Sequence, residues 1–206
     1  MPYKPEEREY RNMRMETRKN EEDKEKTYIV RGYATTYDDP YCLWSEGDTD
    51  YFEQVSKEAF DDKTDTSDVI FQLNHTGMVY ARNRNKTLSF GSDDHGLWIE
   101  ADLSLTEESR KIYDAIDKGL IDQMSFAFTV DNEEWDKKTH TRTIKHIKKL
   151  YDVSAVSCPA NPGTEISARS AFEGYIEAEK LEKLEAERRD KQRQKIRILT
   201  EVSKWN

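Results

Sequence analysis

GLIDQMSFAFTV, residues 119–130, is the stretch from which the fold can be worked out. From residue 124 onward its even positions are large and apolar, and its odd positions are small. Because successive side chains of a β-strand point to opposite faces, this pattern predicts a strand with one face in a core. Ser125 lies on the other face. A serine there usually fills a small space, so a chemical role depends on the groups that other parts of the chain bring to it.

The rest of the chain also has the composition of β-structure. Four segments combine β-branched or aromatic residues with alternation or turn signals, and we expect strands and hairpins in residues 27–37, 41–60, 68–75 and 86–103. In the first of them, Gly32 suits a bulge or a close backbone approach. Within the second, residues 51–60 are expected to form a short strand that runs into a helical turn. In the last, residues 93–96 suit a hairpin turn. The expected fold class is therefore β-rich α+β.

Two helices are also expected. Ser104 or Thr106 can cap a helix that begins with acidic residues, which favour the positive end of the helix dipole. Gly119 suits the end of that helix. From residue 165 onward, acidic residues precede basic ones by four positions beside a narrow apolar stripe. This pattern predicts a long charged helix that either packs back on the domain or binds a partner helix.

Charge divides the chain into three parts. Residues 1–26 carry eight basic and eight acidic side chains and almost no aliphatic ones. Such a segment cannot offset its chain entropy by burial, so we expect a flexible arm. Residues 173–206 carry nine basic and eight acidic side chains, and we expect a charged helical extension. The folded domain is expected over residues 27–172, which therefore hold the excess of acid behind the net charge of −9.

These properties argue against several classes of protein. An acidic centre disfavours nucleic acid as a partner, because phosphate binding requires clustered Lys and Arg. Cys42 and Cys158 lie far apart without CxxC partners, so neither a disulfide framework nor a zinc site is indicated. No apolar run approaches the length of a membrane span, and the N-terminus is charged where a signal peptide is apolar. We expect a cytosolic protein with no cofactor, no metal and no membrane contact.

Two further residues attract attention. His75 ends an apolar row, and it is either a core histidine with one backbone hydrogen bond or a base at a rigid strand end that substrate can reach. Asp152 lies near the start of a mostly apolar, β-branched segment, residues 150–158. A carboxylate is unfavourable there unless it has a partner or faces solvent at an edge. The residues alone leave both alternatives open.

Ser125, His75 and Asp152 together supply the parts needed for acyl transfer. A serine hydroxyl is too weak an acid to attack an amide unaided, so it needs a base at hydrogen-bond distance. His75 can take that proton, and Asp152 can hold the other ring nitrogen protonated. However, the order His, Ser, acid differs from that of common hydrolases, and the chain has no GxSxG turn.

A series of linked pieces over residues 27–168 resembles the caudovirus prohead proteases, the capsid-maturation serine proteases related to the herpesvirus assemblins. Each piece is weak alone, and together they are specific. The pieces are Arg31-Gly32-Tyr33-Ala34, Asn74-His75, Gly96-Leu97, Glu100-Ala101, Gly119, Met124-Ser125-Phe126-Ala127-Phe128, Asp152-Val153-Ser154 and Pro159-Ala160-Asn161-Pro162.

The resemblance implies a serine endopeptidase with Ser125 as nucleophile, His75 as base and Asp152 as the orienting acid. The family usually has a glutamate at the position of Asp152, and the viral relatives use a second histidine there. His140 or His146 is therefore the alternative third member. The main-chain N–H groups expected to form the oxyanion hole are those of Asn161, Gly163 and Thr164.

The resemblance also implies a fold and a biological setting. The fold would be a small, mostly antiparallel β-barrel with flanking helices. The protein would be packaged inside a procapsid in the host cytoplasm, where it would cut scaffolding protein or the scaffolding segment of the major capsid protein, and itself. A homodimer, as in the viral relatives, is left open.

Two other functions compete with this one. A catalytically silent assembly or scaffolding protein would keep the same strands for packing and use the long helix to bind capsid subunits. A metal-dependent hydrolase could use His75, His95, His140 and Asp152, but their spacing matches no ligand signature.

Overall fold

The computed structural model describes residues 8–14, 28–157 and 162–202 of the 206-residue chain. The chain divides into two compact units. One is Lys4–Ala168, and the other is Arg169–Asn206 with Met1–Tyr3. All the strands belong to the first unit.

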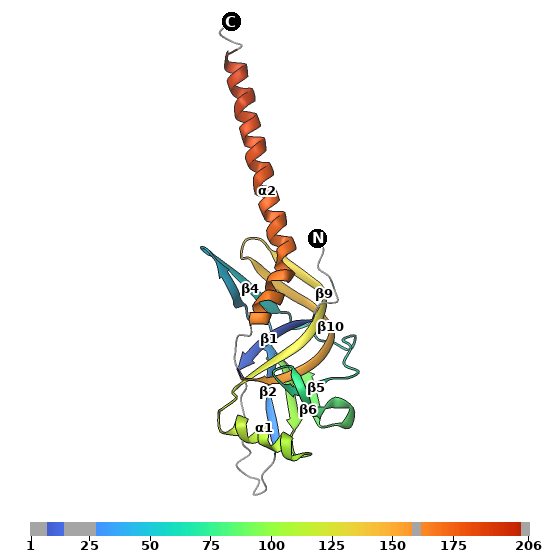
Figure 1. The fold of residues 1–206 in the computed structure, drawn as a ribbon. Helices are drawn as coiled ribbons and strands as arrows, with labels where there is room; N and C mark the ends of the chain where they lie inside the picture. Colours follow the sequence, from blue (N-terminus) through green and yellow to red (C-terminus); the bar gives the residue numbers. More distant parts are fainter. Residues whose placement is uncertain (1–7, 15–27, 158–161, 203–206) are drawn as a thin grey trace. The chain divides into compact units, whose positions relative to one another are not determined.

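The first unit contains two β-sheets (Figure 1). In the larger, seven-stranded sheet the order is β1-β9-β10-β4-β3, and in addition β5 pairs with β10 and β6 pairs with β5. Its strands are β1 (Glu9–Arg14), β3 (Tyr41–Glu46), β4 (Thr49–Val55), β5 (Ile70–Leu73), β6 (Thr76–Arg82), β9 (Gln123–Asp136) and β10 (Thr141–Val156). The smaller sheet has the order β2-β8-β7, with β2 (Ile29–Thr36), β7 (Leu88–Ser92) and β8 (Gly96–Asp102). The β-rich prediction is confirmed.

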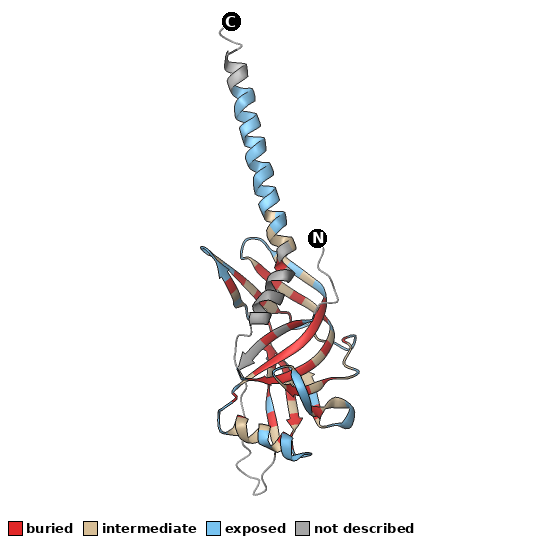
Figure 2. Cartoon of the chain, viewed as in Figure 1, coloured by how far each residue is buried: buried red, intermediate tan, exposed pale blue. Residues whose placement is uncertain are grey.

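β9 is the strand predicted from the alternation in residues 119–130. Phe126 and Phe128 stack on one face with ring centroids 4.6 Å apart, and both are fully buried. Ser125, on the other face, is also fully buried. Residues 124–130 are therefore covered on both sides, and this part of β9 is coloured as buried in Figure 2.

The helix before β9 begins where its cap was predicted. α1 (Glu107–Asp117) has Thr106 as its N-cap, and the Thr106 hydroxyl oxygen accepts the N–H of Ser109 at 3.0 Å. Gly119 follows with φ of 70°, a left-handed conformation that glycine adopts without steric cost. A short 3₁₀ helix, η1 (Asn83–Asn85), joins β6 to β7.

The long hairpin of β9 and β10 is strongly bent, as Figure 1 shows. In its first half Phe128 pairs with Glu9 of β1, and seven residues further along Trp135 pairs with Arg142 of β10. Seven residues of straight strand span about 23 Å. Nevertheless, the Arg142 guanidinium donates to both carboxylate oxygens of Glu9, at 2.5 and 2.8 Å. The hairpin must bend for these groups to meet, and the register shifts in β10 between residues 144 and 152 supply the bend.

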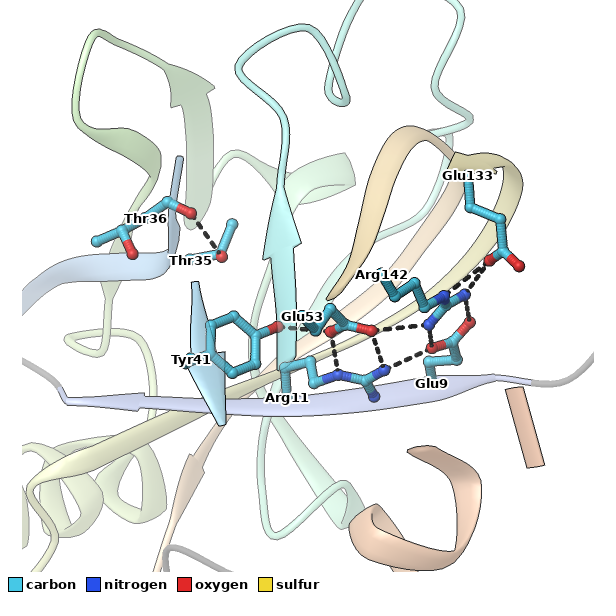
Figure 3. Close-up of polar contacts among 8 residues, drawn as sticks. All are labelled: Glu9, Arg11, Thr35, Thr36, Tyr41, Glu53, Glu133 and Arg142. Atoms are coloured by element: carbon cyan, nitrogen blue, oxygen red, sulfur yellow. Dashed lines mark hydrogen bonds and ion pairs between the residues drawn. The ribbon is translucent and has the colours of Figure 1, made fainter. Parts of the chain in front are cut away.

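A buried cluster of charged residues occupies the inside of this bend (Figure 3). Its members are Glu9, Arg11, Glu53, Glu133 and Arg142, with the Tyr41 hydroxyl at one end, and we call it the charged cluster. Arg11 donates to Glu53 at 2.5 and 2.7 Å and to Glu9 at 2.6 Å. Arg142 donates to Glu9, Glu53 and Glu133. These bonds tie β1 to β4, β9 and β10.

Two expectations need correction. Residues 9–14 were expected to belong to a flexible arm, but they form β1, because Glu9 and Arg11 are buried as paired charges and not as apolar groups. The register shift in β2 lies between Tyr33 and Thr35, so the prediction of a bulge at Gly32 is wrong, whereas a close backbone approach there stays a prediction. The short strand and turn predicted in residues 51–60 are confirmed as β4 and the turn after it, and β3 pairs with β4 in a hairpin. Strand pairing among the described residues forms two sheets and no closed ring, so closure into a barrel stays a prediction.

The second unit is the greater part of α2 (Pro162–Val202), which starts close to the predicted boundary at residue 165. Its side chains from residue 180 to 197 are exposed (Figure 2). In the described part of the chain, no helix combines the length and the apolar character that crossing a bilayer requires.

Candidate active site

Ser125 lies in a row of polar residues that crosses four strands of the large sheet. Its register partners are Asn12 in β1 and Ser154 in β10. Ser154 is in turn the partner of Gln72 in β5. We call Asn12, Ser125, Ser154 and Gln72 the serine row. Since directly opposed residues in a sheet point to the same face, the side chains of Ser125 and Ser154 lie next to each other.

Asp152 and His75 meet on this same face. Asp152 lies two residues before Ser154 in β10, so the two side chains share a face. Its Oδ1 atom is 2.5 Å from Nδ1 of His75, and the two side chains are only 6% and 13% exposed. In a neutral ring this contact requires the proton on Nδ1, which makes Nε2 the basic nitrogen. The predicted pair of acid and base is therefore in contact.

The contact between His75 and Asp152 spans the serine row. β5 runs parallel to β10, and its last residue, Leu73, pairs with Ala155, one position beyond the row. His75 starts further along still, whereas Asp152 lies two positions before the row. Along the strand direction, the backbone of His75 and that of Asp152 therefore lie on opposite sides of the serine row, and their side chains meet between these two positions.

The turn that carries His75 has an unusual backbone. Asn74 and His75 have φ of 53° and 57°, a region that residues other than glycine seldom occupy. The Asn74 side-chain oxygen accepts the N–H of Ser157 at 3.0 Å and its hydroxyl at 3.2 Å. The Asn74 N–H donates to the carbonyl of Ala155 at 2.9 Å. Leu73 pairs with Thr76, so Asn74 and His75 form the two-residue loop of the β5–β6 hairpin, and such loops favour positive φ. The loop and its bonds to β10 fix where the His75 side chain begins.

Ser125 is isolated from solvent. It is fully buried, and its Oγ atom has no hydrogen-bond partner among the described residues. Buried hydroxyl groups are usually hydrogen-bonded, so an exception calls for an explanation. A nucleophile that awaits a substrate or a rotation of the imidazole is one such explanation.

Ser154 was not singled out as a site residue by its sequence, although it stood in the Asp152-Val153-Ser154 segment. It is fully buried, and its hydroxyl donates to Oδ1 of Asp152 at 2.8 Å. The same carboxylate oxygen therefore contacts both His75 and Ser154. A polar residue two positions from a strand carboxylate was the available signal, because such residues share a face.

The remaining histidines contact other groups. His95 lies edge-on to Tyr33 with ring centroids 4.5 Å apart, and His140 lies 5.5 Å from the ring of Tyr51. The Nδ1 atom of His146 is 2.5 Å from Asp131, and its Nε2 atom is 3.2 Å from Asp61. Burial lowers the pKa of His146, but these two carboxylates outweigh burial, so the pKa is raised above its ordinary value. Among the candidates for the third member, Asp152 contacts His75.

The expected oxyanion residues are only partly visible. Asn161 lies outside the described residues. Gly163 and Thr164 lie in the first turn of α2, where main-chain N–H groups have no partner within the helix. Such groups can bind a developing negative charge. The oxyanion role of Gly163 and Thr164 therefore stays a prediction.

A buried serine, an imidazole and a carboxylate on one face of a sheet are the groups of a serine hydrolase, carried here by a β-rich domain. Comparison with known proteins refines this class. The chain belongs to the caudovirus prohead serine protease family, whose model matches residues 13–180. The resemblance noted from the sequence is thereby confirmed.

One curated relative is distant. The prohead protease of Escherichia phage T5 is 27% identical over 99 residues, which cover 48% of this chain and 46% of that protein. The chain thus matches less than half the length of this relative. No solved structure matches the chain.

Proposed function

We propose that this protein is a serine endopeptidase of phage capsid maturation, with Ser125 as nucleophile, His75 as general base and Asp152 as the acid that orients the base. The observation that carries the proposal is the contact of 2.5 Å between His75 and Asp152, whose carboxylate also accepts the hydroxyl of Ser154, the register partner of Ser125. Membership of the prohead serine protease family supports the same reaction.

The proposed chemistry follows from the properties of the three groups. Nε2 of His75 takes the proton of Ser125 as the hydroxyl oxygen attacks a peptide carbonyl, and a tetrahedral oxyanion forms. Asp152 stabilises the imidazolium, which then donates its proton to the departing amine. Water repeats the sequence on the acyl-enzyme and restores Ser125. Main-chain N–H groups of Asn161, Gly163 and Thr164 are the proposed donors to the oxyanion.

The proposed substrates are scaffolding protein or the scaffolding segment of the major capsid protein, together with this protein itself. The proposed location is the interior of a procapsid in the host cytoplasm. The exposed, charged side chains of α2 suit contacts with capsid components during co-assembly, and the proposed barrel would be the scaffold that holds the site.

The experiment is co-expression with the major capsid protein and scaffolding protein of the same phage, with intact mass as the measurement. Wild type should shorten at least one of these chains, and Ser125→Ala should shorten none. Thr129→Val is a matched control, because it removes another buried hydroxyl from the same face of β9. Processing that persists in Ser125→Ala would rule out the proposed nucleophile.

A second function is favoured by one observation, the complete burial of Ser125. A catalytically silent assembly protein with a protease-like fold would have no need of an accessible serine. In that case neither wild type nor Ser125→Ala would process any chain, and both would form normal particles. For the protease, burial means instead that the described state is latent and that a movement admits the substrate.

A further inference from the structure

We propose that Ser154 is a positioning residue, which tilts Asp152 along the strand so that His75 is held at the level of Ser125. This inference rests on the proposed function. It concerns a residue for which neither the sequence nor the family membership supplies a role.

The need for such a residue follows from the register of β9 and β10. Asp152 is the register partner of Ala127, not of Ser125. Ala127 and Ser125 are two residues apart, which is about 6.6 Å along a strand. A carboxylate that projected straight out from the sheet would hold the imidazole over Ala127, too far along the strand to serve Ser125.

The hydrogen bond from Ser154 corrects this offset. Ser154 is the register partner of Ser125, and its hydroxyl donates to Asp152 Oδ1 at 2.8 Å. A contact between residues two apart on one strand face requires the aspartate side chain to lean along the strand, toward the serine row. Oδ1 is also the atom that contacts His75, at 2.5 Å. The orientation of the Asp152 side chain therefore determines where the imidazole of His75 is held.

Burial makes this hydrogen bond effective. Ser154 is fully buried and the Asp152 side chain is 6% exposed, so bulk water does not compete for either group. A hydrogen bond to a charged acceptor in such surroundings is worth more than a neutral one. Aspartate also has one methylene fewer than glutamate, so this short side chain depends on an external group to direct it.

The test is the reaction of the full chain with a fluorophosphonate, which phosphonylates an activated serine with loss of fluoride. Peptide mass mapping locates the label. Labelling is followed over a series of reagent concentrations, so that the maximal labelling rate and the reagent concentration at half-saturation are obtained separately. Ser154→Ala should lower the saturating rate at Ser125 about 10- to 100-fold, since a base displaced by about 1 Å can cost that much. The reagent concentration at half-saturation should stay the same. Ser154→Thr, which keeps the hydroxyl, should recover most of the rate.

Two further variants separate positioning from simple packing. Thr129→Val removes a buried hydroxyl that has no hydrogen-bond partner among the described residues and should label at the wild-type rate. Ser154→Cys keeps the size but has a weak donor, so it should label slowly even if Ser154→Ala does not fold. The proposal is overturned if Ser154→Ala or Ser154→Cys labels as fast as wild type, if Thr129→Val is slowed equally, or if the label is found on Ser154. A wild-type chain that is never labelled overturns the proposed function itself, a result distinguishable from the others.

Discussion

Two buried polar clusters lie on opposite faces of the same strand, β9. Arg11 of the charged cluster pairs with Phe126, whereas Asn12 pairs with Ser125, so the charged cluster and the serine row are separated by the thickness of the sheet. In the charged cluster the guanidinium groups each meet at least two carboxylates. On the other face, Ser125 has no hydrogen-bond partner among the described residues.

This difference in pairing indicates that the charged cluster stabilises the fold and that the groups around Ser125 serve a reaction. A charge that is buried with all its partners holds elements together, and removing one partner leaves the others exposed to the full cost of desolvation. A buried hydroxyl without a partner gains nothing for folding. Ser125 differs from Thr129, which is buried in the same way, because it lies beside Ser154 and the contact between His75 and Asp152. Loss of a group from the charged cluster should therefore affect stability, and loss of a group from the other cluster should affect rate.

The largest expected effect is that of Ser125→Ala on the proposed reaction. Turnover should fall by about a million-fold, because removing the nucleophile disables the whole triad. The free energy of unfolding should not fall, because the substitution deletes an unsatisfied hydroxyl. Substrate processing followed by intact mass and chemical denaturation measure the two quantities. A variant that loses stability while it keeps its rate would reverse the assignment of the two clusters.

Asp152→Asn should have the next largest effect. It preserves the shape of the side chain, but an amide does not require the proton on Nδ1 of His75. The proton can then lie on Nε2, which removes the base, so the labelling rate of Ser125 should fall about ten-thousand-fold. Labelling at saturating reagent measures it. Asp131→Asn is the matched control, because that carboxylate contacts His146 instead and should leave the labelling rate unchanged. Equal rates for Asp152→Asn and wild type would show that the contact with His75 has no part in the chemistry.

Arg142→Met should reduce stability more than rate. It leaves Glu9, Glu53 and Glu133 as neighbouring buried carboxylates, which should cost about 3–5 kcal/mol in the free energy of unfolding. Lys57→Met is the control, because its partner Asp94 is 97% exposed and solvent screens the pair. Chemical denaturation measures both variants. If Arg142→Met were as stable as Lys57→Met, the charged cluster would not be what holds β1.

The smallest expected effect concerns His146 and pH. Its pKa is raised in the folded chain, so its contribution to stability is complete below the unfolded value of about 6.5 and disappears as the pH rises through the folded value. His146→Gln should therefore lower the unfolding temperature by a few degrees at pH 5.5 and by less at pH 9. Thermal unfolding at the two pH values measures this, and a difference that grows with pH would contradict the carboxylate contacts.

Much of the fold could be predicted because its signals are local. Alternation predicted β9 and the 86–103 hairpin, and a capping residue with a following glycine predicted α1. His75, Ser125 and Asp152 could be proposed as site residues, although each also fits an ordinary structural role in its local pattern. The family resemblance supplied the link between them.

The rest could not be predicted because it depends on contacts between distant residues. Glu9 and Arg142 are 133 positions apart, and a composition argument treats such charges as solvated. Only the bent hairpin shows that they are paired. Likewise, the offset between Asp152 and Ser125 is a property of strand register, so nothing in the sequence of β10 alone assigns a task to Ser154.

The anchoring of β1 bears on how the chain would behave once it is cut. Glu9 and Arg11 are tied to partners from three other strands, and β1 pairs along its whole length with β9. A break of the backbone anywhere between residues 15 and 27 would therefore not free the N-terminal piece. That fragment would remain with the domain as a separate chain, visible by mass under denaturing conditions and hidden during native purification.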